Sequence, residues 1–140
     1  MIEALELKDR VTVMPHVAYS TLPEVYRSAD AFALPLTDRR EAFGLVALET
    51  MACGVPVMTT ELGTGTTYHN VHGINGYHVL PEDERALAEA IERCADENLK
   101  EKNAALIRKR VKEFSIEKFR SSWEELILSL TEKDIGSEPR

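Results

Sequence analysis

The feature that most constrains this chain is an apolar segment, residues 42–60, that contains a single charged side chain, Glu49. The segment reads AFGLVALETMACGVPVMTT. Its first part is typical of a buried helix and its last part of a buried strand. Burying a carboxylate among apolar side chains costs free energy unless the group is paired, hydrogen-bonded or at the edge of a pocket. The charge of Glu49 therefore requires a partner or a ligand.

A second acid, Glu41, precedes this segment and is separated from Glu49 by seven residues. Residues 30–36 (DAFALPL) indicate a buried parallel strand, and the loop 37–42 follows its carboxyl end, where open α/β sheets bind ligands. Gly44 begins the next helix, whose free first-turn N–H groups attract anions. We expect both acids to point into one crevice beside a phosphate, with one of them binding polyol hydroxyls.

Strands alternate with helices along the chain, which predicts an α/β fold with a Rossmann-like, doubly wound parallel sheet. The predicted strands are Val11–Met14, Ala31–Pro35, Val55–Thr59 and Gly76–Leu80. Helices are expected after Thr21, carrying Val25 and Tyr26, from about Phe43 to Ala52 with Gly54 ending it, and in three segments beyond Pro81.

The three later helices carry apolar stripes at three- and four-residue spacing, which we expect to belong to the core. The stripes are Leu87, Ile91 and Cys94; Leu106, Ile107, Val111 and Phe114; and Phe119, Trp123, Ile127 and Leu130. Thr21 and Glu24 predict a capping box for the first helix, and Ser115 is a suitable N-cap for the last. We expect residues 1–130 to form one domain and residues 131–140 a flexible tail.

Composition excludes some classes of function. A formal net charge of −7 and a pI near 5.1 disfavour a protein that reads the phosphate backbone of nucleic acid. No apolar run approaches the ~20 residues of a membrane span, and residues 1–10 are charged rather than signal-like. Cys53 and Cys94 form no metal or redox spacing, so we expect buried free thiols, as in a reducing cytoplasm.

Three histidines, His69, His72 and His78, lie close together in the sequence. His-x-x-His on one short loop, with no cysteine or carboxylate at a matching distance, is weak support for a metal ion. We therefore predict no metal site.

Taken together, the strand 30–36, the E-x7-E stretch from Glu41 to Glu49 and MACGVPV (residues 51–57) resemble the retaining glycosyltransferases of the GT-B fold, family 4. The likeness runs from roughly Leu7 to Leu130 and includes LPEVYRSAD (22–30) and a loop ending in G-x-x-G-x-x-V-x-P (63–81). It implies the C-terminal, donor-binding half of a glycosyl transferases group 1 enzyme. Such an enzyme transfers a glycosyl unit from a nucleoside-diphosphate sugar to an acceptor hydroxyl with retention, and it needs no metal or other cofactor.

The resemblance also implies a role for individual residues. Glu41 would be the catalytic carboxylate beside the transferred sugar, where it favours an oxocarbenium-like transition state. Glu49 would hydrogen-bond the ribose hydroxyls of the donor. The other donor-binding positions would be Phe43 and Gly44 for sugar hydroxyls, Leu45 and Val46 for the diphosphate or ribose, and His16 and Val17 for the base.

Simpler interpretations stand beside these roles. Without the flanking motifs, Glu41 and Glu49 would be expected to form surface salt bridges with a lysine or with Arg39 and Arg40. The two arginines either meet a phosphate or remain solvated loop charges, and the second is favoured. The GTGTT run (63–67) either touches the sugar or forms a flexible turn.

The chain also departs from the family pattern, at Pro15, Leu36 and Ala42. In the family, two further strand-helix units open this domain and carry an Arg and a Lys for the diphosphate. On this resemblance, we expect these units to lie before Met1 and the N-terminal acceptor domain to be missing as well. In the strand order 3-2-1-4-5-6, Val11–Met14 then lacks its neighbours. We expect a partial domain with an exposed edge, self-association or a partner chain.

The isolated chain is accordingly expected to be inactive in transfer. The acceptor would be a glycan or lipid-linked saccharide reached through the missing domain, as in surface-polysaccharide assembly. A complete enzyme would be cytoplasmic, with a peripheral position at the inner membrane face. The alternatives are a non-catalytic module that binds nucleotide sugars and a structural subunit that completes a split GT-B enzyme.

Overall fold

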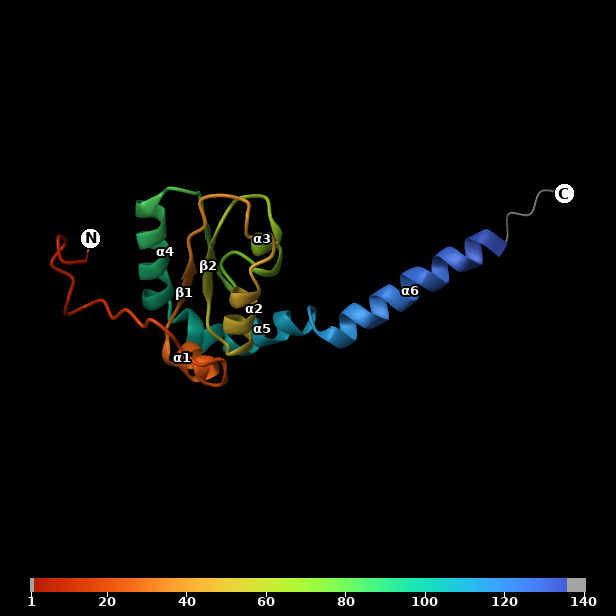
Figure 1. Cartoon of the computed structure of the whole chain (residues 1–140), viewed down its shortest axis with the longest axis horizontal. Coiled ribbons are helices and arrows are strands. Elements are labelled where there is room, and N and C mark those ends of the chain that lie inside the picture. Colours follow the sequence, from red (N-terminus) through yellow and green to blue (C-terminus); the bar gives the residue numbers. More distant parts are fainter. Residues whose placement is uncertain (1, 136–140) are drawn as a thin grey trace.

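The computed structural model describes residues 2–135 and contains one three-stranded parallel sheet with helices on both faces (Figure 1). The helices are the short 3-10 helix η1 (Tyr19–Thr21), α1 (Leu22–Ser28), α2 (Leu45–Ala52), α3 (Gly65–His69), α4 (Glu84–Asp96), α5 (Leu99–Lys112) and α6 (Ile116–Ile135). The strands are β1 (Phe32–Leu34), β2 (Val57–Thr60) and β3 (Gly76–Val79).

The sheet has the order β1-β2-β3, with Ala33 opposite Met58 and Met58 opposite Tyr77. Three of the four predicted strands are therefore confirmed, as is the α/β class. Parallel neighbours require crossover connections, and α2 provides the crossover from β1 to β2 while α3 lies between β2 and β3.

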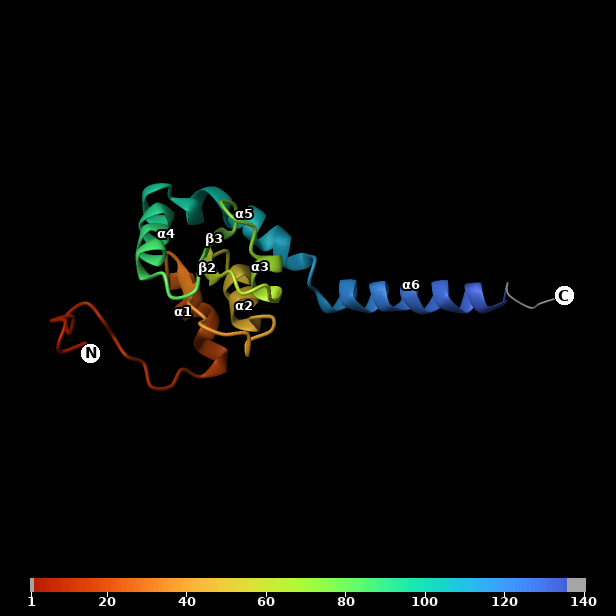
Figure 2. The same ribbon diagram turned by 90° about the horizontal axis from the view of Figure 1, so that it is seen from above.

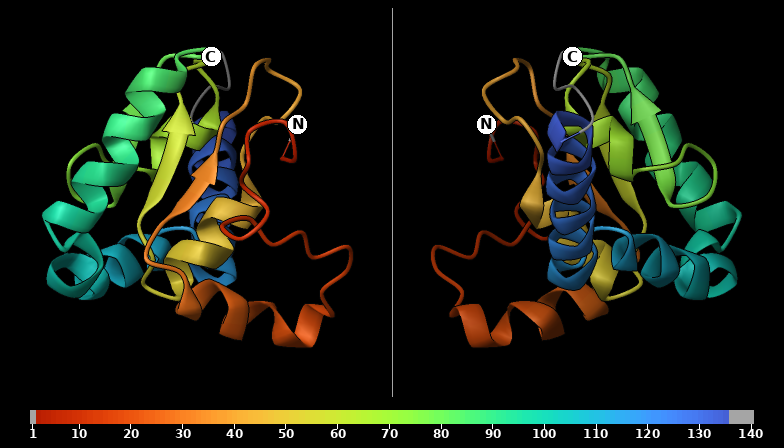
Figure 3. Two further views of the ribbon diagram at one scale, coloured as in Figure 1. Left: turned by 90° about the vertical axis from the view of Figure 1, so that its left-hand side faces the viewer. Right: turned by 90° about the vertical axis from the view of Figure 1, so that its right-hand side faces the viewer.

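The core has two layers because successive residues of β2 point to opposite faces of the sheet. Val57 packs with Ala47 and Met51 of α2 and with Ile107 of α5. Met58 packs on the other face, against residues of β3 and α4. Figure 3 shows α4 on one side of the sheet and α2 on the other. The sheet is therefore wound on both faces, as the sequence predicts.

The fourth predicted strand, Val11–Met14, is wrong. These residues have no regular structure, and Val13 is 71% exposed. A strand needs a neighbour to hydrogen-bond, and no segment of residues 2–135 pairs with this one. In a doubly wound order this segment would be separated from β1 by other strands, and it does not pair with the open edge of β1.

The prediction that the last apolar stripe belongs to the core is also wrong. Phe119, Trp123, Ile127 and Leu130 are each more than half exposed. Figures 1 and 2 show why, because α6 extends away from the sheet and no described element lies along most of its length. No helix of the described residues is both long enough and apolar enough to cross a membrane.

The two earlier stripes are confirmed only on their inner positions. Cys94 and Ile107 are buried, and Leu87 and Val111 pack against the core. Ile91 and Leu106 are instead exposed, because the helices that carry them are covered on one side only.

The predictions for the helix caps, the cysteines and the tail are confirmed only in part. Ser115 accepts a hydrogen bond from the Lys118 amide at 3.2 Å, so its capping role is confirmed. Thr21 instead donates to the Ala18 carbonyl and forms no capping box. Both cysteines are free, with Cys94 buried and Cys53 half-buried. Helix α6 continues to Ile135, past the expected start of the tail, and residues 136–140 lie outside the described part.

Replacing Gly76 should strongly destabilise the fold. Gly76 has a φ of 152°, and a Cβ there would overlap the Val57 carbonyl oxygen and lie 2.6 Å from its carbon. We expect Gly76→Ala to lower the free energy of unfolding by about 3 kcal/mol in urea titrations. Gly73→Ala is the matched control, since its φ is 77° but nothing lies within 4 Å. Equal losses in the two variants would contradict this account of the close approach.

Stability should fall at high pH because two buried groups hold their protons tightly. Burial, with the hydrogen bond to Glu97, raises the pKa of Tyr77 from 10.0 to about 12. Burial raises the pKa of the Cys94 thiol from 9.0 to about 11. The folded state thus binds more protons than the unfolded chain above pH 9, so the free energy of unfolding declines from there to about pH 12.

Urea unfolding at several pH values checks this expectation. Cys94→Ala should remove the part of the decline that starts near pH 9, and Tyr77→Phe the part above pH 10. If the free energy of unfolding falls with pH equally in the two variants and in the unmodified chain, the expectation is wrong.

Candidate functional site

The loop between β1 and α2 ends in a tight turn at the amino end of α2. Gly44 occupies the N-cap position with φ 75° and ψ 57°, a left-handed conformation that favours glycine. A Cβ would also be crowded here, because it would lie 3.1 Å from Thr66 Cγ2 and 3.4 Å from Leu34 Cδ2. The amide groups of Leu45 and Val46 find no acceptor among the described residues. This helix end thus presents free N–H donors.

Glu41 holds this turn from its outer side. Its Oε1 accepts hydrogen bonds from the amides of Gly44 at 2.8 Å and Phe43 at 3.3 Å. The side chain is otherwise exposed and lines a hollow of about 490 Å³, here called the Glu41 hollow. The other residues of the Glu41 hollow are Pro35, Leu36, Thr37, Asp38 and Arg40. One carboxylate oxygen therefore organises the backbone and the other remains available.

Glu49 lies on the side of α2 that faces α1. Its nearest partner is the Tyr26 hydroxyl, which donates to Oε2 at 3.5 Å, and it forms no ion pair with any described residue. Burial, followed by the charge of Glu49, raises the pKa of Tyr26. The carboxylate lines a hollow of about 310 Å³, the Glu49 hollow. Its other residues are Tyr19, Leu22, Pro23, Tyr26, Arg27, Ala52 and Cys53. The lone charge is therefore half-buried with one long hydrogen bond.

The structure does not bring the two acids into one crevice. Glu41 folds back onto the amides at the start of α2, whereas the turn of the helix directs Glu49 toward α1. The salt-bridge interpretation is not met either within the described residues, since Arg40 pairs with Asp38 and Arg39 donates to the Gly63 carbonyl at 3.1 Å. Both arginines are exposed loop charges.

Helix α3 supports the turn from its inner side. The GTGTT run starts this helix, and the Gly65 amide donates to the Ala42 carbonyl at 2.7 Å. His69, at the other end of α3, lies with Nε2 2.7 Å from the Phe43 carbonyl oxygen. The sequence does not predict this contact, because a histidine in a polar loop carries no signal of its burial.

His69 is bonded to the turn, whereas His72 and His78 contact each other away from it. Apart from the His69 bond to Phe43, His72 Nδ1 accepts from the His78 amide at 3.1 Å, and His78 Nε2 lies 2.6 Å from the Asn70 carbonyl. Within residues 2–135, no group of three or more His, Cys, Asp or Glu side chains is arranged to hold a metal ion.

The predicted base-contacting residues lie in the irregular segment before η1. His16 is exposed, Val17 is half-buried, and neither lines the Glu49 hollow. Their contact with a base stays a prediction.

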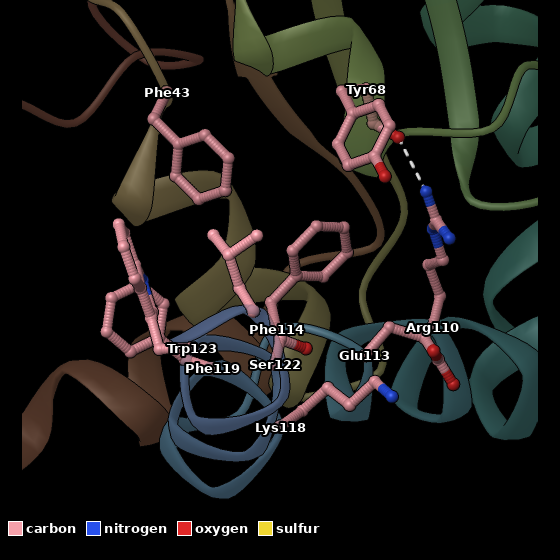
Figure 4. Close-up of a pocket in the computed structure, with 10 residues that line it drawn as sticks. Phe43, Tyr68, Arg110, Glu113, Phe114, Lys118, Phe119, Ser122 and Trp123 are labelled. Atoms are coloured by element: carbon pink, nitrogen blue, oxygen red, sulfur yellow. Dashed lines mark hydrogen bonds between the residues drawn. The ribbon is translucent and has the colours of Figure 1, made fainter. Parts of the chain in front are cut away.

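A third and larger hollow, the aromatic hollow, borders the turn on the side of α5 and α6 (Figure 4). It measures about 680 Å³. Its residues are Phe43, Tyr68, Arg110, Glu113, Phe114, Lys118, Phe119, Ser122, Trp123 and Leu126. The Phe43 side chain thus reaches from the turn into an apolar surface built by three helices.

Known proteins are similar to this chain in sequence and in fold. A family model described as glycosyl transferases group 1 matches residues 1–113. D-inositol 3-phosphate glycosyltransferase from Mycolicibacterium smegmatis is 36% identical over 96 residues, which are 69% of this chain and 21% of that protein.

Solved structures are also similar to this chain in fold. Sucrose-phosphate synthase from Thermosynechococcus elongatus superposes with a TM-score of 0.79 and 31% identity over 94% of this chain and 33% of that one. HepE from Anabaena in complex with UDP gives a TM-score of 0.76 and 26% identity over 91% and 35%. HepE has also been solved in complex with UDP-glucose.

This chain spans about a fifth to a third of the length of these proteins. Its parallel sheet wound on both faces has the fold of the C-terminal domains of GT-B glycosyltransferases. Since the family model covers most of its residues, the chain belongs to the glycosyl transferases group 1 family.

Proposed function

We propose that this chain is the donor-binding domain of a retaining, family 4 glycosyltransferase. It binds a nucleoside-diphosphate sugar along α2, for transfer of the glycosyl unit to an acceptor hydroxyl. The observation that carries the proposal is the Gly44 turn, which leaves the Leu45 and Val46 amides without acceptors at a helix N-terminus. Such donors attract phosphate groups.

The two separate hollows fit the two ends of such a donor. A nucleoside-diphosphate sugar is extended, with its ribose and its sugar on opposite sides of the diphosphate. Glu49 offers an acceptor-only carboxylate in the hollow beside α1, where it binds the ribose hydroxyls. Glu41 lies at the other side of the turn, where its carboxylate stabilises positive charge on the sugar. The Phe43 and Gly44 backbone then contacts sugar hydroxyls, and His16 and Val17 the base.

Similar proteins support the class of donor. HepE, at 26% identity, was solved with UDP and with UDP-glucose. We propose a hexosyltransferase-like reaction in polysaccharide assembly, carried out in the cytoplasm or at the inner membrane face, with no metal ion required. The acceptor, a glycan or lipid-linked saccharide, is held by another domain. The chain by itself then binds the donor without transferring the sugar.

A second candidate is a binding or structural subunit that completes a split GT-B enzyme. The observation that favours it is β1, which is hydrogen-bonded on one edge only among the described residues. Its other edge can accept a strand from a partner chain. Donor binding by the isolated chain separates a binding module from a purely structural one. Sugar transfer on mixing with an acceptor-domain polypeptide identifies a split enzyme.

Removing the Glu49 carboxylate should weaken donor binding sharply and leave the fold intact. Charge-assisted hydrogen bonds contribute about 1.5–3 kcal/mol, so we expect Glu49→Ala to weaken nucleotide binding by at least about tenfold. Calorimetric titration with GDP, UDP, ADP and their common sugars measures this loss and identifies the base.

The matched control is Glu92→Ala, which removes an exposed carboxylate from α4. Its affinity should equal that of the unmodified chain. If Glu49→Ala binds normally, the donor-site assignment fails, and if it unfolds by circular dichroism, Glu49 has a structural role.

Glu41 should be required for chemistry rather than for donor binding. In Glu41→Gln the amide oxygen can still accept from the Gly44 and Phe43 amides, so we expect the turn and the donor affinity to be retained. Loss of the charge should lower sugar transfer by about 10²-fold or more, measured with radiolabelled donor after mixing with an acceptor-domain polypeptide. Full transfer activity in this variant would remove Glu41 from the mechanism.

A further inference from the structure

His69 makes one hydrogen bond from a fully buried position. Its ring is 0% exposed, with Nε2 2.7 Å from the Phe43 carbonyl oxygen and Nδ1 without a partner among the described residues. Burial lowers the pKa of His69 and outweighs the bond to Phe43, which raises it. Since a carbonyl only accepts, the neutral ring carries its proton on Nε2 and donates it to Phe43.

Arg110 of α5 fixes the backbone from which His69 extends. Its Nη2 donates to the Tyr68 carbonyl at 2.7 Å and its Nε to the His69 carbonyl at 3.4 Å. The guanidinium also lies 5.0 Å from the centre of the Phe114 ring. Figure 4 shows the arginine reaching from α5 to Tyr68, with the Phe114 ring between Tyr68 and Phe43. A five-residue helix has little stability alone, and this bridge is one of the contacts that hold α3, beside the bond from the Gly65 amide to the Ala42 carbonyl.

The bond from His69 acts on the same peptide group that Glu41 holds. The Phe43 carbonyl and the Gly44 amide are the two ends of one peptide plane, and they bond to His69 at 2.7 Å and to Glu41 at 2.8 Å. Glycine tolerates either sign of φ, so this plane could otherwise rotate. Rotation would turn the carbonyl oxygen toward the Glu41 carboxylate and the amide away from it.

The Phe43 ring adds a packing restraint to this arrangement. It lies edge-on to the His69 ring, with 5.4 Å between centroids, and to the Phe114 ring at 6.0 Å. The side chain therefore anchors the turn to α3 and to the segment that follows α5.

We infer that His69 is a positioning residue that locks the Phe43–Gly44 peptide and so fixes the free amides at the start of α2 toward the donor. This inference rests on the proposed donor site. Arg110 serves the same purpose through the backbone of α3. A histidine that only fills the core would require its shape, whereas this role requires the Nε2 donor.

Two replacements of His69 separate the effect of its Nε2–H hydrogen bond from the effect of its shape. His69→Gln keeps an N–H donor at a similar reach and should bind nucleotide within about twofold of the unmodified chain. His69→Leu fills the space without a donor and should bind about tenfold more weakly, as expected for loss of one buried hydrogen bond. His72→Leu removes an exposed histidine away from the turn and is the matched control.

The same proteins are examined by amide NMR of uniformly ¹⁵N-labelled full chain. The Gly44 and Leu45 resonances should be single in the unmodified chain, in His69→Gln and in His72→Leu, and broadened or doubled in His69→Leu. If His69→Leu does not fold, Arg110→Met gives the second test, because it retains the side-chain stem and loses the bonds to α3. It should broaden the same two amides.

The outcomes distinguish this inference from the proposed function. If the unmodified chain binds none of GDP, UDP, ADP or their sugars, the donor proposal fails, while the amide spectra still test the peptide lock. If the chain binds and folded His69→Leu binds equally well with unchanged Gly44 and Leu45 signals, His69 is not a positioning residue. If His69→Leu does not fold, unchanged Gly44 and Leu45 signals in folded Arg110→Met would overturn the inference.

Discussion

Burial of β2 on both of its faces is the constraint on which the rest of the structure depends. All four residues of this strand are buried, and each neighbouring strand is parallel to it. Parallel pairing demands crossover helices, and two buried faces demand helices on both sides. The carboxyl ends of the strands are thereby gathered at one edge of the sheet, and the crossover that leaves β1 must turn there into α2.

The candidate site is a consequence of that turn. The chain reverses through a left-handed Gly44, which leaves the first amides of α2 unpaired beside two carboxylates with different surroundings. Support for the turn comes from distant residues, since Arg110 of α5 holds α3, and α3 holds the Phe43 carbonyl. The geometry of the helix end is thus set both by the loop's own Glu41 and Gly44 and by contacts with α3 and α5.

Much of this arrangement could be predicted from local pattern. The short apolar runs of β1, β2 and β3 and the Gly54 that follows α2 have strong local signals, and the isolated charge of Glu49 identified a surface that needs a partner. The errors have a common cause. Val11–Met14 has the composition of a strand but no partner to pair with, and the stripe on α6 has the spacing of a core helix but no described surface against it. A pattern reports what a segment could bury and not whether a neighbour is present.

The sequence by itself determined the fold class, the start of a helix near Gly44 and the two acids on either side of that start. Hydrophobic periodicity, the conformational freedom of glycine and an unpaired charge are properties of single residues or short segments. They can therefore be recognised without knowing what packs against them. Only the tertiary structure decided that Glu41 and Glu49 face different hollows and that His69 is buried against the Phe43 carbonyl. Those outcomes depend on the rotation of α2 against α1 and on the contact of α3 with α5, and both arise from packing between residues far apart in the sequence.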